Sequence, residues 1–156
     1  MTPKDFTPDN KPWTVLDSSS LYGLDHWGDE YFSINLNGNI SIKPKQHYSK
    51  HLDLLELVKE LEGRNLKLPL LIRFDDILED RLKRINEAFK NAIHQYHYTG
   101  QYQGVYPVKC NQQRHVVEEL LACGRQWNFG LEAGSKAELL IALSVMNNPK
   151  ALLICN

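Results

Sequence analysis

From residue 66 onward, apolar strand-like runs alternate with segments of helical periodicity, and this alternation constrains the fold more than any other feature of the chain. Strand, short turn and helix in regular succession is the pattern of a β/α unit, whose strands pair in a parallel sheet. The sequence therefore predicts an α/β fold with four parallel strands. The four strand-like runs cover residues 68–74, 102–109, 128–132 and 151–155.

Two of the helices between these runs begin with a predicted capping box, in which an N-cap side chain and a glutamate three residues later bond to free backbone N–H groups. The pairs are Asp76 with Glu79, and Ser135 with Glu138. The first of these helices has the spacing typical of a helix with one apolar face. Its apolar positions are Leu78, Leu82, Ile85, Phe89 and Ile93.

The residues before this alternation differ in type and divide the chain into predicted parts. Residues 1–26 are polar, contain prolines and show no periodicity, which predicts a flexible amino-terminal arm. Residues 27–65 are predicted to hold a hairpin and a short helix. The hairpin spans 31–42, where apolar residues alternate on both sides of an Asn-Gly turn, and the helix covers 52–61. The β/α units then occupy residues 66–156.

A complete β/α barrel has eight strands and typically about 250 residues. This chain has 156 residues, and its last predicted strand runs into the final residues. We therefore expect the chain to contain the first four strands of a TIM-type (β/α)8 barrel, truncated inside the barrel. An open sheet made of the same strands is the alternative.

Lys109 stands at the end of the apolar run 102–109, and β/α proteins carry their chemistry at the carboxyl ends of their strands. A lysine that loses hydration there favours its neutral amine over the ammonium form. A neutral amine can form an imine with an aldehyde or a ketone. The alternative is a solvated lysine whose stem packs on the protein and whose ammonium lies in water.

Glu132 closes the next run, in the same layer as Lys109. Adjacent parallel strands lie about 5 Å apart, so the two side chains can interact. The carboxylate favours a charged lysine and opposes the effect of lost hydration. A catalytic pair and a plain structural ion pair both agree with this pattern.

The bulk properties exclude several classes of partner. A net charge of −1 gives no reason to expect nucleic acid or an anionic membrane. No apolar stretch has the length of a membrane span, and the first residues lack the apolar core of a secretion signal. Three cysteines without metal-type spacing indicate reduced, mostly buried thiols in a cytoplasmic protein. They are Cys110, Cys123 and Cys155.

Two long motifs closely resemble the biosynthetic arginine decarboxylases of bacteria. They are residues 106–114 (YPVKCNQQR) and residues 130–139 (GLEAGSKAEL). The resemblance covers nearly everything after the first twenty residues. Shorter stretches at 22–28, 31–32, 84–86 and 153–156 also agree.

The resemblance implies a pyridoxal 5′-phosphate enzyme that converts L-arginine to agmatine for polyamine and spermidine synthesis. It implies that Lys109 holds the cofactor as an imine, and that Glu132 falls where related decarboxylases carry an acidic residue near that lysine. It further implies an alanine-racemase-like barrel with an additional β domain, to which the hairpin at 31–42 would contribute. Magnesium as a second cofactor and a homo-oligomeric assembly are also implied.

Two other functions remain open at this point. One is a related decarboxylase acting on ornithine, lysine or diaminopimelate, which would share the cofactor lysine. The other is a non-catalytic cofactor-binding or regulatory homologue. By resemblance, the later strands supply the phosphate site and the partner of the pyridine nitrogen. We therefore expect the 156 residues alone to be inactive.

Overall fold

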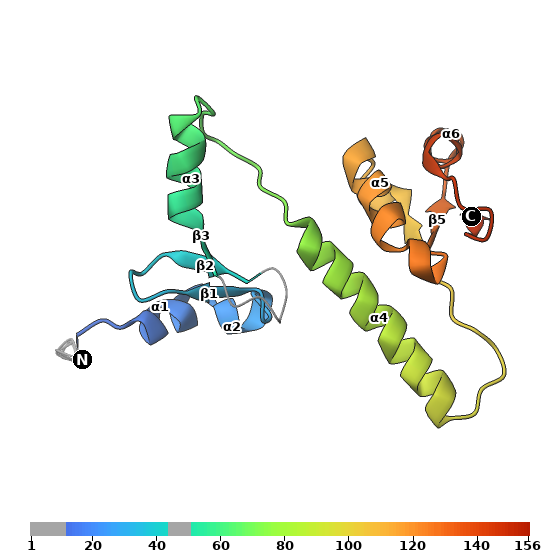
Figure 1. Cartoon of the computed structure of the whole chain (residues 1–156), viewed down its shortest axis with the longest axis horizontal. Helices are drawn as coiled ribbons and strands as arrows, with labels where there is room; N and C mark the ends of the chain where they lie inside the picture. Colours follow the sequence, from blue (N-terminus) through green and yellow to red (C-terminus); the bar gives the residue numbers. More distant parts are fainter. Residues whose placement is uncertain (1–11, 44–50) are drawn as a thin grey trace, which may run out of the picture. The chain divides into compact units, whose positions relative to one another are not determined.

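The computed structural model describes residues 12–43 and 51–156 (Figure 1). The chain divides into two compact units, Met1–Ile72 and Arg73–Asn156. Among the described residues, no helix is both long enough and apolar enough to cross a membrane.

The first unit begins with two helices, α1 (Val15–Tyr22) and α2 (Leu24–Trp27). The prediction of a flexible arm is therefore wrong over these residues, while residues 1–11 lie outside the described part. A capping box stabilises the start of α1, because the Thr14 side chain accepts from the Asp17 N–H and the Asp17 side chain accepts from the Thr14 N–H. Gly23 ends the helix with a φ of 61°, a left-handed conformation that glycine adopts readily. These caps explain why a helix forms here although the sequence shows no apolar periodicity.

The predicted hairpin is confirmed. Strand β1 (Phe32–Ile34) pairs antiparallel with β2 (Ile40–Ile42), with Phe32 opposite Ile42. A third strand, β3 (Leu52–Asp53), pairs with β2 and was not predicted, because two residues are too few to show alternation.

The predicted short helix is also confirmed, as α3 (Leu54–Gly63). It starts two residues later than expected because Asp53 is its N-cap. The Asp53 carboxylate accepts hydrogen bonds from the N–H groups of Leu55 and Glu56. The same carboxylate accepts from the side-chain amides of Asn35 and Asn39, at 2.7 and 2.9 Å. Asp53 thus ties the hairpin turn to the start of α3.

The strand predicted at 68–74 is wrong. These residues contain no strand, and Leu68 and Leu71 are 59% and 75% exposed. A strand needs a partner for its N–H and C=O groups, and no described residue pairs with this segment. Pro69 also lacks an N–H group. The boundary between the two units, after Ile72, falls inside the segment.

The second unit confirms the α/β class with three parallel strands where four were expected. The strands are β4 (Val105–Pro107), β5 (Gly130–Ala133) and β6 (Leu153–Cys155), and they are adjacent in chain order. Helices α5 (Arg114–Cys123) and α6 (Lys136–Val145) connect them, and α4 (Asp75–Gln95) precedes β4. This is the strand–helix alternation that the sequence indicated.

One face of the sheet packs against α5 and α6. Leu131 is fully buried there with Val108, Val117 and Ala142, and Leu153 packs against the same cluster. Side chains alternate across a strand, so the opposite face carries the next residue of each strand. That face holds Pro107, Glu132 and Ile154 in register across the three strands.

Helix α4 differs from its prediction at its N-cap and along its predicted apolar face. It starts at Asp75, and its N-cap is Phe74, which gives no side-chain cap. The predicted box of Asp76 with Glu79 is therefore wrong, because Asp76 lies inside the first turn. Leu82 is buried, whereas Ile85 and Phe89 are 44% and 48% exposed. Only part of the predicted apolar face is therefore buried.

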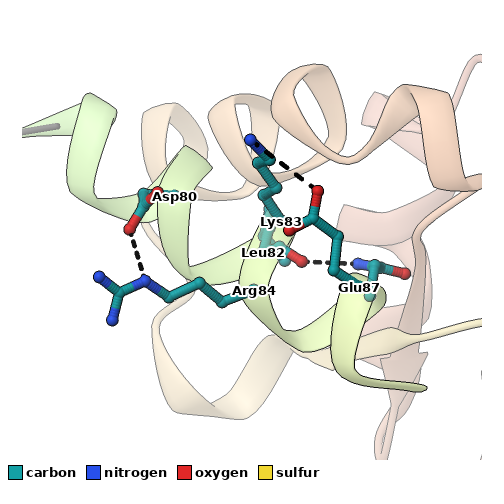
Figure 2. Close-up of polar contacts among 6 residues, drawn as sticks. Asp80, Leu82, Lys83, Arg84 and Glu87 are labelled. Atoms are coloured by element: carbon teal, nitrogen blue, oxygen red, sulfur yellow. Dashed lines mark hydrogen bonds and ion pairs between the residues drawn. The ribbon is translucent and has the colours of Figure 1, made fainter. Parts of the chain in front are cut away.

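The polar side chains of α4 bond along their own helix (Figure 2). Asp80 and Arg84 form an ion pair of 2.8 Å, and Lys83 and Glu87 one of 3.8 Å. The buried side-chain amide of Asn86 donates to the carbonyl oxygen of Leu82 at 2.8 Å.

Candidate active site

Lys109 follows β4 directly, inside a single 3-10 turn that spans Val108–Cys110. Val108 is fully buried and anchors the turn, but the Lys109 side chain is 59% exposed. The expectation of a desolvated amine is therefore wrong for the described chain. The turn carries Lys109 beyond the end of the strand ladder, and among the described strands β4 is an edge strand that pairs with β5 alone.

Glu132 lies on the central strand, opposite Pro107 of β4 and Ile154 of β6. The residue is 8% exposed. Its Oε1 lies 3.8 Å from the Nζ of Lys109, so the predicted closeness of the two side chains is confirmed. Their roles in a reaction stay predictions.

The carboxylate of Glu132 is short of partners. Both of its oxygens are buried, and neither accepts a hydrogen bond from any described residue. A buried polar group without a hydrogen bond is costly, and a mostly exposed ammonium at 3.8 Å compensates little because water screens it. The site thus presents a mostly exposed lysine amine beside a buried carboxylate that accepts no hydrogen bond from the described residues. That arrangement fits a site completed by a bound group.

The segment after Lys109 is held by side-chain contacts that the sequence reading missed. Asn111 Oδ1 accepts the N–H of Gln113 at 3.0 Å, and Gln113 Oε1 accepts from the guanidinium of Arg73. Arg73 stands near the end of an apolar run, as Lys109 does. That shared position could have marked Arg73 as a residue near the site. Arg114 instead pairs along its own helix with Glu118 at 2.8 Å, which raises the pKa of Arg114.

The cysteines are free, as predicted, but their expected burial is wrong. Cys110 and Cys155 are exposed, and Cys123 is half-buried. Burial, followed by a hydrogen bond to Glu119, raises the pKa of Cys123 to about 12. Burial also raises the pKa of Tyr106, with a smaller contribution from Cys110.

The turn between β5 and α6 lies directly beyond Glu132. Ser135 caps α6, as predicted, and its Oγ accepts the N–H of Glu138 at 3.2 Å. The buried carboxylate of Glu138 reaches back to the same turn and accepts from the N–H of Gly134 at 2.8 Å.

A cleft of about 700 Å³ in the second unit lies away from this pair. One wall is α4 and the other is formed by residues that precede β4 and β5, among them Tyr102 and Trp127. It therefore lies at the amino ends of the strands, whereas Lys109 stands at a carboxyl end. Within residues 12–43 and 51–156, no group of three or more His, Cys, Asp or Glu side chains could hold a metal ion.

Residues 82–156 match the family described as pyridoxal-dependent decarboxylase, pyridoxal binding domain. Lys109 and Glu132 both lie inside the matched range. The biosynthetic arginine decarboxylase of Prochlorococcus marinus (strain MIT 9313) is 67% identical over all 156 residues, and that of Parasynechococcus marenigrum (strain WH8102) is 68% identical over 148 residues. Over its whole length, the chain is thus similar in sequence to biosynthetic arginine decarboxylases.

The chain spans 24% and 23% of the length of these two biosynthetic arginine decarboxylases. A crystal structure of the biosynthetic arginine decarboxylase from Campylobacter jejuni is similar in fold, with a TM-score of 0.77 and 39% sequence identity. The similarity covers 86% of this chain and 22% of the Campylobacter chain. The α/β arrangement described above is thus similar to part of a solved biosynthetic arginine decarboxylase.

Proposed function

We propose that this chain is the cofactor-lysine part of a pyridoxal-phosphate-dependent decarboxylase that converts L-arginine to agmatine and carbon dioxide. One observation carries the proposal. The amine of Lys109 lies 3.8 Å from a buried carboxylate with no hydrogen bond, inside the range matched by the pyridoxal-binding family. The reaction belongs to the complete protein.

When bound, pyridoxal phosphate supplies an aldehyde that bonds to a lysine amine and a ring that takes up the electron pair left by the departing carboxylate. The described residues fit that group in two respects. Lys109 offers an accessible primary amine, and Glu132 offers acceptor oxygens without donors.

Each of the two residues then has a defined task. Lys109 would hold the cofactor through its amine, and when that amine is free it would carry a proton to the reacting carbon. Glu132 attracts the released Lys109 as an ammonium and keeps it near the site, since the two charges already stand 3.8 Å apart. The carboxylate therefore orients the lysine between its two tasks.

We also propose that β4, β5 and β6 are the first strands of an alanine-racemase-like β/α barrel. Their adjacency in chain order, with a helix between each pair, supports this. The barrel part, predicted over 66–156, would then begin near Arg73, where the second unit starts. The hairpin at 31–42 would contribute to the additional β domain.

The other family properties rest on resemblance alone. They are a homo-oligomeric assembly, a cytoplasmic location and a place in polyamine and spermidine synthesis. Magnesium is also expected by resemblance, but no group of side chains in the described residues fits that ion. No step of the proposed reaction runs through it.

Arginine is favoured over ornithine, lysine and diaminopimelate because the relatives at 54–68% identity carry the name biosynthetic arginine decarboxylase. In the full-length protein, we expect carbon dioxide release from L-arginine to exceed release from the other three amino acids by at least about 100-fold, since a site built for one polar group rejects analogues that lack it. Equal turnover of ornithine would contradict the arginine assignment.

A labelling experiment tests the cofactor role directly. The full-length protein is incubated with pyridoxal phosphate, reduced with borohydride and mapped by peptide mass spectrometry. We expect the label on Lys109 and its loss in Lys109→Ala. Lys136→Ala is the matched control, because Lys136 is also exposed and lies at the start of α6. No label on Lys109 would favour the non-catalytic homologue.

A further inference from the structure

Glu138 is a buried acid with an unusual reach. It is 8% exposed, although it stands in the first turn of α6. Its Oε1 accepts from the Ser135 hydroxyl at 3.1 Å, and its Oε2 accepts from the Gly134 N–H at 2.8 Å. Both oxygens thus have donors, in contrast to those of Glu132.

These bonds differ from those of an ordinary capping box. There the glutamate at the third helical position bonds to the backbone N–H of the N-cap residue. Here the N-cap is Ser135, and the carboxylate bonds to the N–H of Gly134, one residue earlier. Glu138 therefore holds the turn outside the helix, two residues after Glu132.

Both carboxylates have an oxygen close to Gly134. A side-chain carbon at Gly134 would lie 3.6 Å from Glu138 Oε2 and 3.8 Å from Glu132 Oε1. Because the carboxylate of Glu132 accepts no hydrogen bond from the described residues, its side chain is placed by its backbone, its packing and the long ion pair with Lys109. That backbone is fixed by the strand ladder on both sides and by the turn that Glu138 holds.

We propose that Glu138 is a positioning residue for the Lys109–Glu132 pair, acting through the Gly134 N–H. The inference rests on the proposed function of that pair. Without the Gly134 bond, the turn after β5 relaxes and Glu132 loses the place from which it orients the amine. Displacements of about 1 Å at a reacting group cost up to about 100-fold in rate.

The test compares variants of the full-length protein by the rate at which Lys109 gains a borohydride-stable pyridoxal phosphate label. Glu138→Ala removes both bonds, and we expect labelling to slow by about 10- to 100-fold. Glu138→Gln keeps an oxygen for the Gly134 N–H and should label within about threefold of the natural protein. Ser135→Ala is the control, because it removes the helix cap and the hydroxyl bond to Glu138 Oε1 but leaves the Gly134 bond.

The melting temperature of each variant separates positioning from simple helix capping. We expect Ser135→Ala and Glu138→Ala to lower it alike, while only Glu138→Ala slows labelling. Should Glu138→Ala not fold, Glu138→Asp replaces it, since one methylene less keeps the charge but shortens the reach to Gly134. Equal slowing in the alanine variants, or normal labelling in Glu138→Ala, overturns the inference. No label on Lys109 in the unchanged protein overturns the proposed function itself.

Discussion

The side chain of Glu132 lowers the stability of the fold but suits a site that binds a further group. Both of its oxygens are buried without hydrogen bonds, and leaving such a group unsatisfied costs about 1–3 kcal/mol. The attraction of Lys109 returns little of this, because its side chain is 59% exposed and surface ion pairs contribute about 0–1 kcal/mol. A charge kept under these conditions is more useful to a bound group than to the folded chain.

Replacing Glu132 by leucine should therefore stabilise the protein. We expect Glu132→Leu to raise the free energy of unfolding by about 1–3 kcal/mol in urea titrations, because an apolar side chain replaces an unsatisfied carboxylate between Pro107 and Ile154. The same change should remove the ion pair that orients the Lys109 amine. Leu131→Ala, on the other face of the same strand, should cost about 2–5 kcal/mol. Destabilisation by Glu132→Leu would show that the carboxylate has partners after all.

Asp53 is a second acid with a structural consequence, and here the hydrogen bonds are present. The side-chain amide of Asn39 is the largest cause of a lowered pKa at Asp53, and the bonds to Glu56, Asn35 and Leu55 act in the same direction, against desolvation. A lowered pKa in the folded state contributes stability above the ordinary range of an aspartate. That contribution is lost as the pH falls toward the lowered value.

We therefore expect acid to loosen the first unit by way of Asp53. Circular dichroism at falling pH should show loss of α3 and of the strands β1 to β3 once the Asp53 carboxylate takes up a proton. Asp53→Asn should be less stable at neutral pH and should lack this component of the acid response. An unchanged acid transition in Asp53→Asn would refute the role.

At the scale of elements, local signals predicted more than distant ones. The hairpin was predictable because alternation and the Asn-Gly turn lie within a dozen residues, and Ser135 was found as a cap for the same reason. The prediction of a strand at 68–74 was wrong because an apolar run is compatible with a strand but does not show whether another backbone segment pairs with it. The burial of Glu132 depends on two strands distant in sequence, β4 and β6, so the sequence could predict its neighbour Lys109 but not its missing donors.

Gln103 binds the three parallel strands together at their amino ends. Its side-chain amide donates to the carbonyl oxygens of Asn128 at 3.0 Å and Lys150 at 2.7 Å, which precede β5 and β6. We expect Gln103→Ala to lower the free energy of unfolding by about 1–2 kcal/mol, as two hydrogen bonds are lost. Urea titration followed by tryptophan fluorescence measures it. Gln101→Ala, at an exposed neighbouring residue, is the control and should leave the free energy of unfolding unchanged. Equal losses in the two variants would show that the Gln103 hydrogen bonds do not stabilise the sheet.

At the scale of the whole molecule, the chain is two units joined by a segment without regular structure. Residues 66–72 belong to no helix or strand, and Leu66, Leu68 and Leu71 are 48–75% exposed. Such segments reach the extended conformation that proteases need with less local unfolding than helices do. The helices α3 and α4 on either side are bonded along their length.

Among the lysines and arginines of the described residues, brief trypsin treatment should therefore cut first after Lys67, producing fragments that end there and fragments that start at Leu68. Mass spectrometry at short times identifies the first cut. Lys67→Gln removes the site, and we expect cleavage to slow or move to Arg64, whose side chain is paired with Glu60 and lies at the end of α3. The lysines and arginines of α4 should react later, because cleavage there requires opening a helix that also packs on α5 through Leu82 and Leu120. A first cut inside α4 would show that the second unit is less stable than the segment before it, and the division of the chain at Ile72 would then not describe how it opens.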